Sequence, residues 1–216
     1  MSPSLAAAWR YRREPSLACY TACKSRMDPA YAFVANAFSD SKLPLLDIGC
    51  GAGHLAAYLR AKGFAAPITG VDADARKIAA ARSALPDCEF LAGDALNLPD
   101  HSGNVVLLDV LHYFSVEDRR RLLTGIRQRL ASGGRGRAIL RVTLRDNSWR
   151  FAVTRLEEWV VRVSGWIPFR ASGFPSREEL VAHCGDSLQE LRPLWSGTPF
   201  NSYALILRER PPDGRA

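Results

Sequence analysis

The stretch Leu45-Leu46-Asp47-Ile48-Gly49-Cys50-Gly51-Ala52-Gly53-His54 decides the fold of this 216-residue chain. An apolar strand pattern runs directly into three glycines at alternate positions, and a helix pattern follows. Glycine adopts backbone dihedrals that a Cβ forbids, and the first turn of the following helix offers unpaired N–H groups to a ligand. The stretch therefore predicts a nucleotide-binding turn.

The acid in this stretch, Asp47, lies just before the turn. Its carboxylate is placed either to orient the glycine loop or to accept hydrogen bonds, through water, from a ligand's ammonium group. An anionic diphosphate would not need such an acceptor.

Composition indicates one globular domain over residues 1–210, because 47% of the residues are hydrophobic and 24% are charged. No apolar run approaches the roughly 18 residues of a membrane span, and the first residues lack a signal-peptide pattern, so we expect a cytoplasmic protein. Five scattered cysteines predict reduced thiols without a disulfide framework, and no metal site is expected. The formal charge of +7 favours an acidic partner, an anionic membrane surface or simply a solvated basic exterior.

The hydrophobic pattern alternates between strands and helices along the middle of the chain. Continuous apolar runs such as 105–108 are typical of parallel strands covered by helices on both faces. Strands are predicted at 43–48, 68–71, 89–91, 105–109 and 137–144, and helices at 54–62, 74–84 and 116–130.

The flanking regions have other patterns. Residues 1–40 predict a helical cap, and an aromatic, apolar helix at 149–163 lies within a candidate substrate lid at 146–175. A short helix is expected at 176–183, followed by two antiparallel strands at 188–194 and 203–207 and a disordered tail at 211–216.

The glycine turn is ambiguous by itself, because Gly51-x-Gly53-x-x-Ala56 also satisfies the dinucleotide fingerprint. Asp72 ends the second strand, where one carboxylate can hold both hydroxyls of a ribose. Its alternative role is a helix cap, for which Asp74 is better placed.

Beyond this turn the chain resembles the class I S-adenosylmethionine-dependent methyltransferases. Their first motif, acid-x-Gly-x-Gly-x-Gly, matches residues 47–53, and residues 70–72, 93–95, 106–113 and 130–134 match later motifs in order. The resemblance is specific over about 43–145. It implies an α/β, Rossmann-like, doubly wound sheet of seven mostly parallel strands with a reversed C-terminal strand.

The resemblance also implies S-adenosyl-L-methionine as the cofactor. It places three glycines against the methionine moiety, Asp72 on the ribose and Asp94 near the adenine, with Phe90 beside that ring. The alternatives are that Asp94 caps a turn and that Phe90 fills the core. The complete set assigned to the cofactor is Asp47, Gly49, Cys50, Gly51, Gly53, Asp72, Ala73, Gly93, Asp94, Ala95 and Asp109.

His112 is the candidate catalytic base, because it follows the fourth strand at the edge where open α/β sheets bind ligands. The alternative is a histidine that orients Asp109 or binds backbone, since an already ionised acceptor needs no base. Tyr113 is the second catalytic candidate, as a residue that orients the acceptor or closes the cofactor pocket. Cys50 has no base beside it and is interpreted as a packing residue.

The aromatic helix at 149–163 favours a small aromatic or acyl acceptor, with O-methylation the favoured reaction. Packing on the sheet or a homodimer interface is the alternative role of this helix. Segments 24–31, 109–113, 149–151 and 197–201 are also similar to methyltransferases of bacterial aryl polyene and related pigment pathways. That similarity implies secondary metabolite biosynthesis and an acidic acyl carrier protein as partner, docking at 119–121 or at Arg135 and Arg137.

Three other functions remain open. An RNA methyltransferase fits the charge, but the chain has neither an Asn-Pro-Pro-Tyr-like motif nor an appended RNA-binding module, so nucleic acid is not favoured. A NAD-dependent oxidoreductase would use the dinucleotide fingerprint with Asp72. A non-catalytic binding protein would retain the fold alone.

Overall fold

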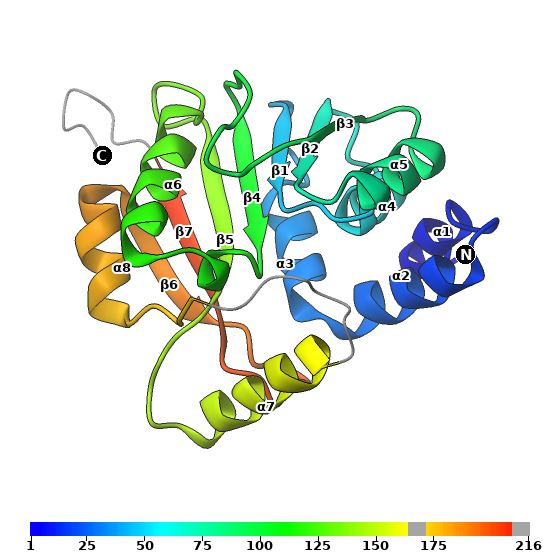
Figure 1. Cartoon of the computed structure of the whole chain (residues 1–216). Coiled ribbons are helices and arrows are strands. Elements are labelled where there is room, and N and C mark those ends of the chain that lie inside the picture. Colours follow the sequence, from blue (N-terminus) through cyan, green and yellow to red (C-terminus); the bar gives the residue numbers. More distant parts are fainter. Residues whose placement is uncertain (164–171, 209–216) are drawn as a thin grey trace.

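The computed structural model describes residues 1–163 and 172–208. One seven-stranded sheet has the order β3-β2-β1-β4-β5-β7-β6 (Figure 1). β1 to β5 pair in parallel, whereas β7 is antiparallel to both β5 and β6, which confirms the predicted fold class. The strands are β1 Leu45–Ile48, β2 Ile68–Asp72, β3 Glu89–Ala92, β4 Asn104–Leu108, β5 Arg137–Thr143, β6 Leu188–Pro193 and β7 Ser202–Arg208.

Helices cover both faces of this sheet, with α6 and α8 on one side and α3, α4 and α5 on the other (Figure 1). Successive side chains of a strand point to opposite faces, so Leu45 joins one hydrophobic core and Leu46 the other. Apolar residues on both faces of the central strands are explained by these two cores. The helices are α1 Pro3–Trp9, α2 Pro15–Met27, α3 Pro29–Ala37, α4 His54–Ala61, α5 Ala75–Ala84, α6 Val116–Gln128, α7 Trp149–Val163 and α8 Arg177–Cys184.

Local capping explains where several helices begin. Asp74 accepts a hydrogen bond from the Arg76 N–H and caps α5, and Ser115 does the same for Asp118 at the start of α6. Both caps were predicted and are confirmed. α6 ends at Gln128, two residues earlier than predicted.

The strand register brings the ends of four strands together at one edge. Ile48 at the end of β1 lies beside Val71 of β2 and Leu107 of β4, and Asp72 lies beside Ala92 of β3. The loops that follow these strands therefore meet at the carboxyl edge of the sheet, where ligands bind in open α/β folds.

The helical N-terminal cap and the helix after β5 are both present. α7 lies apart from the helices that cover the sheet (Figure 1). Part of the predicted lid, residues 164–171, and the whole of the predicted tail, 211–216, fall outside the described residues. Among the helices that are described, none is long and apolar enough to cross a membrane.

Candidate active site

The glycine turn after β1 is held in a left-handed conformation. Gly49, Gly51 and Gly53 have φ values of 75°, 56° and 80°. A Cβ on Gly49 would overlap the Val110 side chain, and one on Gly53 would lie 3.0 Å from Phe90 Cζ, whereas a Cβ on Gly51 would meet nothing within 4 Å. The first and third glycines are therefore required by packing, and the second faces open space on the side where a ligand would lie.

Asp72 ties this turn to the start of α5. Its Oδ2 accepts a hydrogen bond from the Gly51 N–H at 2.8 Å, and its Oδ1 accepts one from the Asp74 N–H at 2.9 Å. The N-cap of α5 is Asp74. Asp72 therefore stands directly beside the glycine turn, and its ribose role remains a prediction.

Asp47 is a buried carboxylate beneath the turn, 3% exposed. Its Oδ2 has no hydrogen-bond partner among the described residues, and the N–H groups of Gly49 and Cys50 donate to the Val71 carbonyl instead. Burial, reinforced by the negative charge of Asp72, raises the pKa of Asp47 to about 7. A buried acceptor without a donor is costly, so this oxygen suits a cationic ligand group.

The titration of Asp47 predicts a pH-dependent affinity for a ligand that carries an ammonium group. Because the pKa of Asp47 in the folded protein, about 7, lies above the ordinary value of 3.8, the folded state binds the proton more tightly. The contribution of this carboxyl group to stability is full below the ordinary pKa and is lost as the pH rises to about 7. A cation favours the ionised form. S-adenosylhomocysteine should therefore bind about tenfold more weakly at pH 6 than at pH 8, as measured by isothermal titration. Asp47→Asn should remove this dependence, and an unchanged pH profile in that variant would contradict the assignment.

The turn after β3 contains the predicted adenine-contacting residues. The Gly93 N–H donates to the Asp72 carbonyl at 3.0 Å, and the exposed Asp94 accepts from the Leu96 N–H at 3.0 Å. Asp94 thus caps a turn, which leaves its cofactor role a prediction. Phe90 is 2% exposed and fills the core, as the alternative interpretation stated.

Cys50 has a packing environment rather than a reactive one. The residue is 7% exposed, and burial together with the nearby negative charges of Asp47 and Asp72 raises the pKa of its thiol. A thiol with a raised pKa stays protonated at neutral pH, so it is a poor nucleophile.

Asp109, immediately after β4, is a non-glycine residue with a φ of 59°. Arg141 from β5 binds both of its carboxylate oxygens and also binds Asp28, which precedes α3. Lys24 lies 2.9 Å from the same Asp28 carboxylate. This ion-pair network joins the N-terminal cap to the carboxyl edge of the sheet. The role of Asp109 at the cofactor remains a prediction.

Charge pairing dominates the ionisation of Asp28. Burial opposes ionisation, yet the Arg141 guanidinium and the Lys24 ammonium bring the pKa of Asp28 below its ordinary value. Asp28 therefore stays charged at neutral pH, and the network remains intact there.

His112 lies in a short 3₁₀ helix, Leu111–Tyr113, and is 4% exposed. Its ring packs between Tyr113 and Phe174, with centroid distances of 4.1 and 5.4 Å. Glu158 of α7 places Oε1 3.2 Å from His112 Nε2, close enough for an ion pair but without hydrogen-bond geometry. The acid paired with His112 is thus Glu158, whereas Asp109 pairs with Arg141.

Tyr113, the second catalytic candidate, is adjacent to this pair. Burial and the negative charges of Glu158 and Glu157 raise the pKa of its phenol. The hydroxyl therefore stays protonated and retains its capacity to donate a hydrogen bond.

Most of the candidate site lies in a segment that is similar to known proteins. Residues 45–134, which span the glycine turn, Asp72, the Gly93–Ala95 turn and the Asp109–Tyr113 segment, match a family model described as "Methyltransferase domain". We call residues 45–134 the methyltransferase domain after this match, which covers less than half of the chain. Arg141 and Glu158 lie outside the matched residues, so the domain contains the cofactor candidates but only part of the candidate catalytic site.

Curated relatives match a part of the chain. Among them are the trans-aconitate 2-methyltransferases of Escherichia coli O139:H28 and Shigella dysenteriae serotype 1, each 41% identical over 83 residues. The match covers 38% of this chain and 32% of each relative, so the chain aligns with only about a third of their length.

Solved structures extend the likeness in fold beyond the methyltransferase domain. Magnesium protoporphyrin IX methyltransferase from Synechocystis PCC 6803, with bound SAH, has a TM-score of 0.64 at 19% identity and covers 87% of this chain and 83% of its own. Mitomycin 7-O-methyltransferase MmcR has a TM-score of 0.65 at 22% identity, with 94% and 60% covered. PH0226 from Pyrococcus horikoshii OT3 has a TM-score of 0.64 at 18% identity, with 97% and 96% covered. The predicted resemblance to class I methyltransferases is confirmed.

Arg119 corrects one expectation about the surface of the methyltransferase domain. It belongs to the run 119–121 that was predicted to face an acidic carrier or solvent, but its side chain is only 3% exposed. It donates to Glu179 Oε1 at 2.8 Å, to the Leu111 carbonyl at 3.2 Å and to the Gly173 carbonyl. Arg119 therefore holds the Leu111 backbone, next to His112, and the Gly173 backbone, whose N–H donates to the His112 carbonyl.

Arg119→Ala should lower the free energy of unfolding by about 3–5 kcal/mol, because it removes a buried guanidinium and leaves the partly buried Glu179 carboxylate and two backbone carbonyls without their partner. Arg120→Ala is the matched control: its guanidinium lies on the exposed side of α6, 2.6 Å from the exposed Glu117, and its loss should not change stability measurably. Urea denaturation measures both. Equal stability of the two variants would show that the Arg119–Glu179 pair does not stabilise the fold.

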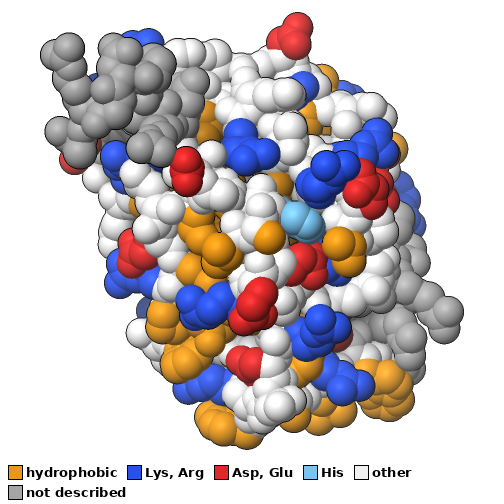
Figure 2. All heavy atoms as spheres, turned by 90° about the vertical axis from the view of Figure 1, so that its left-hand side faces the viewer, with side chains coloured by type: hydrophobic (Ala, Val, Ile, Leu, Met, Phe, Trp, Pro, Cys, Tyr) orange, Lys and Arg blue, Asp and Glu red, His pale blue; other side chains and the backbone are white. Residues whose placement is uncertain are grey.

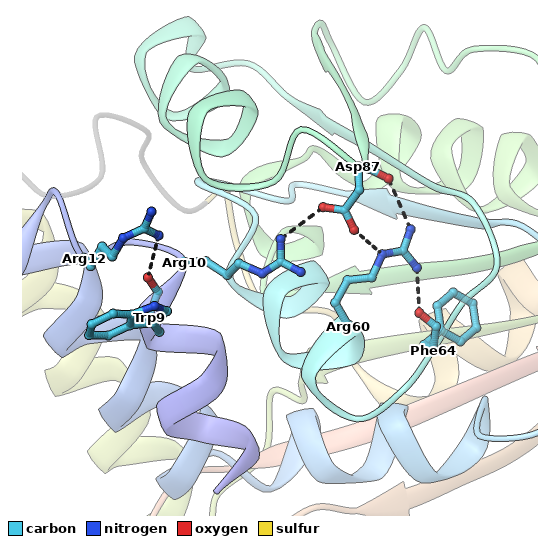
Figure 3. A network of polar contacts seen from close by, with 6 residues as sticks. All are labelled: Trp9, Arg10, Arg12, Arg60, Phe64 and Asp87. Carbon is cyan, nitrogen blue, oxygen red and sulfur yellow. Dashed lines mark hydrogen bonds and ion pairs between the residues drawn. The ribbon is translucent and has the colours of Figure 1, made fainter. Parts of the chain in front are cut away.

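The N-terminal cap also supports the glycine turn of the methyltransferase domain. The buried Tyr11 hydroxyl donates a 2.7 Å hydrogen bond to the Ala52 carbonyl within the turn. Nearby, Asp87 bridges Arg10 of the cap and Arg60 of α4 at 3.3 and 3.0 Å (Figure 3). Sequence patterns gave no signal for these contacts, because the partners are far apart along the chain.

Tyr11→Phe removes this hydroxyl and leaves the Ala52 carbonyl without its partner. We expect the free energy of unfolding to fall by about 1–3 kcal/mol, measured by urea denaturation, and the affinity for S-adenosylhomocysteine to fall with it. Unchanged values for both quantities would show that the cap does not support the turn.

Proposed function

We propose that this chain is an S-adenosyl-L-methionine-dependent methyltransferase that methylates an oxygen atom of a small aromatic or acyl substrate. The observation that carries the proposal is the unpartnered, buried Oδ2 of Asp47 beneath a glycine turn that is open at Gly51. An oxygen that lacks a donor suits a ligand with an ammonium group and disfavours the diphosphate of a dinucleotide.

The chain's own residues fit such a cofactor. The turn at Gly49, Gly51 and Gly53 would hold the methionine moiety, with Asp47 facing its ammonium group through water. Asp72 would bind the ribose. The cofactor supplies an electrophilic methyl group on a sulfonium, so the protein's main task is to position the acceptor oxygen. The adenine would lie beside Gly93, Asp94 and Ala95, with Cys50, Ala73 and Asp109 completing the site.

His112 supports transfer to oxygen. A hydroxyl or carboxylic acid must lose a proton when it is methylated, and a neutral imidazole can take that proton at neutral pH. The Glu158 carboxylate, 3.2 Å from Nε2, would stabilise the imidazolium that results. Tyr113, whose hydroxyl stays protonated, would orient the acceptor.

Aromatic side chains around His112 support an aromatic or acyl acceptor. Phe174 stacks on the imidazole, and Phe151 of α7 meets Phe174 edge to face with 5.3 Å between ring centroids. Among proteins of similar fold, two are named as mitomycin 7-O-methyltransferase and as a pyocyanin biosynthetic protein. These names support a role in secondary metabolite biosynthesis, and we keep an aryl polyene-like acyl chain as the acceptor to test first.

An acyl carrier protein would present such a chain. With Arg119 buried, the candidate docking residues are Arg120, Arg121, Arg135 and Arg137. Arg120 and Arg121 already pair with acids of their own helix, Glu117 and Asp118, so a carrier would compete with these exposed pairs. We place the reaction in the cytoplasm, without nucleic acid as partner. A homodimer remains part of the proposal to be tested.

The test is a methyl-transfer screen with S-adenosylmethionine that carries a deuterated methyl group, read by mass spectrometry. The acceptors are phenols, free carboxylic acids, polyenoyl thioesters on an acyl carrier protein, amines and tRNA. We expect labelled oxygen products from phenols or acyl substrates. Label only in amines, carbon or tRNA would contradict the proposal.

A further inference from the structure

A continuous apolar surface lies along α7. Trp149, Ala152, Leu156, Trp159 and Val160 recur at intervals of three and four residues, so they share one face of the helix. We call this face the α7 stripe. Trp149 is 62% exposed, Leu156 61%, Trp159 54% and Val160 51%. These are large apolar side chains in water, and such contiguous exposure marks an interaction surface.

The opposite face of α7 holds the helix on the molecule. Thr154 is buried and accepts a hydrogen bond from the Asn201 N–H at 2.9 Å. Glu158 lies beside His112, and Arg150 donates to the Thr198 carbonyl at 2.6 Å. The α7 stripe is therefore the outward face of an anchored helix.

The charges around the α7 stripe are distributed unequally. Arg155 is exposed, and the Arg150 guanidinium lies over the Trp149 and Trp195 rings at 4.7 and 5.0 Å. Glu158 is directed inward to His112, whereas Glu157 is exposed. Figure 2 shows hydrophobic side chains beside Lys and Arg side chains at the lower end of the molecule, the end at which α7 lies in Figure 1.

We propose that the α7 stripe docks on an anionic lipid surface, with α7 lying in the plane of the interface. A 15-residue helix is too short to span a bilayer, but an apolar face bordered by arginines suits binding at the level of the headgroups. Tryptophan favours this boundary because its ring is apolar and its N–H is polar.

The positive charge of the chain favours an acidic lipid surface over a second copy of the chain as the partner of the α7 stripe. With a formal charge of +7 and arginines beside the stripe, two stripes that face each other would repel, whereas acidic headgroups attract the protein. Docking would bring the His112–Glu158 pair close to the membrane surface, because Glu158 belongs to the same helix. The inference goes beyond the proposed reaction and does not depend on it.

The test is co-sedimentation of the full chain with phosphatidylcholine vesicles and with vesicles that also contain phosphatidylglycerol. We expect binding to the anionic vesicles, at least tenfold weaker binding for the double variant L156Q/W159Q, and weaker binding of the unaltered chain at high salt. The matched control is L5Q/W9Q on α1, which removes the same two residue types at exposures of 56% and 63%. This control should bind within twofold of the unaltered chain.

Several outcomes would overturn the proposal. They are no binding of the unaltered chain to anionic vesicles, equal losses in the two double variants, or a loss confined to L5Q/W9Q. A concentration-dependent dimer in analytical ultracentrifugation that L156Q/W159Q abolishes, without vesicle binding, would assign the stripe to a second copy. Circular dichroism checks the folding of each variant, and Trp149→Gln replaces L156Q/W159Q if that variant is unfolded.

Discussion

Asp72→Ala is expected to weaken the binding of S-adenosylhomocysteine by about 10–1000-fold, measured by isothermal titration. The substitution removes the acceptor proposed for both ribose hydroxyls. It also removes the 2.8 Å hydrogen bond from the Gly51 N–H, which holds the turn beside the ligand. The ribose contact exists only in the bound state, whereas the Gly51 hydrogen bond is already present without ligand. We therefore expect a loss of both affinity and stability, with the larger effect on affinity.

Asp74→Ala is the matched control for this experiment. Asp74 lies two residues away and caps α5 by accepting from the Arg76 N–H at 2.9 Å. Its loss should lower the free energy of unfolding by about 1 kcal/mol and leave the affinity unchanged within about twofold. Unchanged affinity in Asp72→Ala, or equal losses of affinity in both variants, would contradict the ribose assignment.

His112→Ala is expected to lower turnover by about 10²–10⁴-fold with an acceptor found in the methyl-transfer screen. The imidazole is proposed to take the acceptor's proton, whereas the cofactor candidates lie at the ends of β1 to β4 and do not include His112. The affinity for S-adenosylhomocysteine should therefore stay within about twofold. Steady-state kinetics and isothermal titration measure the two quantities separately.

Glu158→Gln distinguishes a proton-accepting pair from a purely structural contact. If Glu158 stabilises the imidazolium, the variant should lower kcat and shift its pH profile without changing cofactor affinity. His183→Ala, on α8, is the control histidine and should retain full turnover. A parallel loss of turnover and cofactor affinity in His112→Ala would instead assign His112 an architectural role.

The sheet could be predicted because its signals are local. Apolar runs end at glycine or acidic turns, and Asp74 and Ser115 cap helices within three residues of themselves. The antiparallel ending was predictable from the turn at 196–199 between two short strands. Boundaries shifted by one or two residues where the chain bends, as at Asp109, whose left-handed backbone ends β4 earlier than expected.

The charged contacts of the site could not be predicted, because they join residues that are distant in sequence. Arg141 meets Asp28 across 113 positions, and Glu158 meets His112 only because α7 folds back over the sheet edge. Burial of Arg119 had a usable signal: it lies three residues before Leu122 and seven before Ile126, on the buried face of α6. This helical spacing was overlooked because Arg119 was interpreted together with Arg120 and Arg121 as one basic run.

The most direct test of the account is isothermal titration of the purified chain with S-adenosylmethionine and S-adenosylhomocysteine, with NAD as the control ligand. We expect micromolar binding of the first two ligands and none of NAD. It also predicts weaker binding at pH 6 than at pH 8, through Asp47. Binding of NAD alone, or of none of the three ligands, would contradict the proposal that the glycine turn holds a sulfonium cofactor.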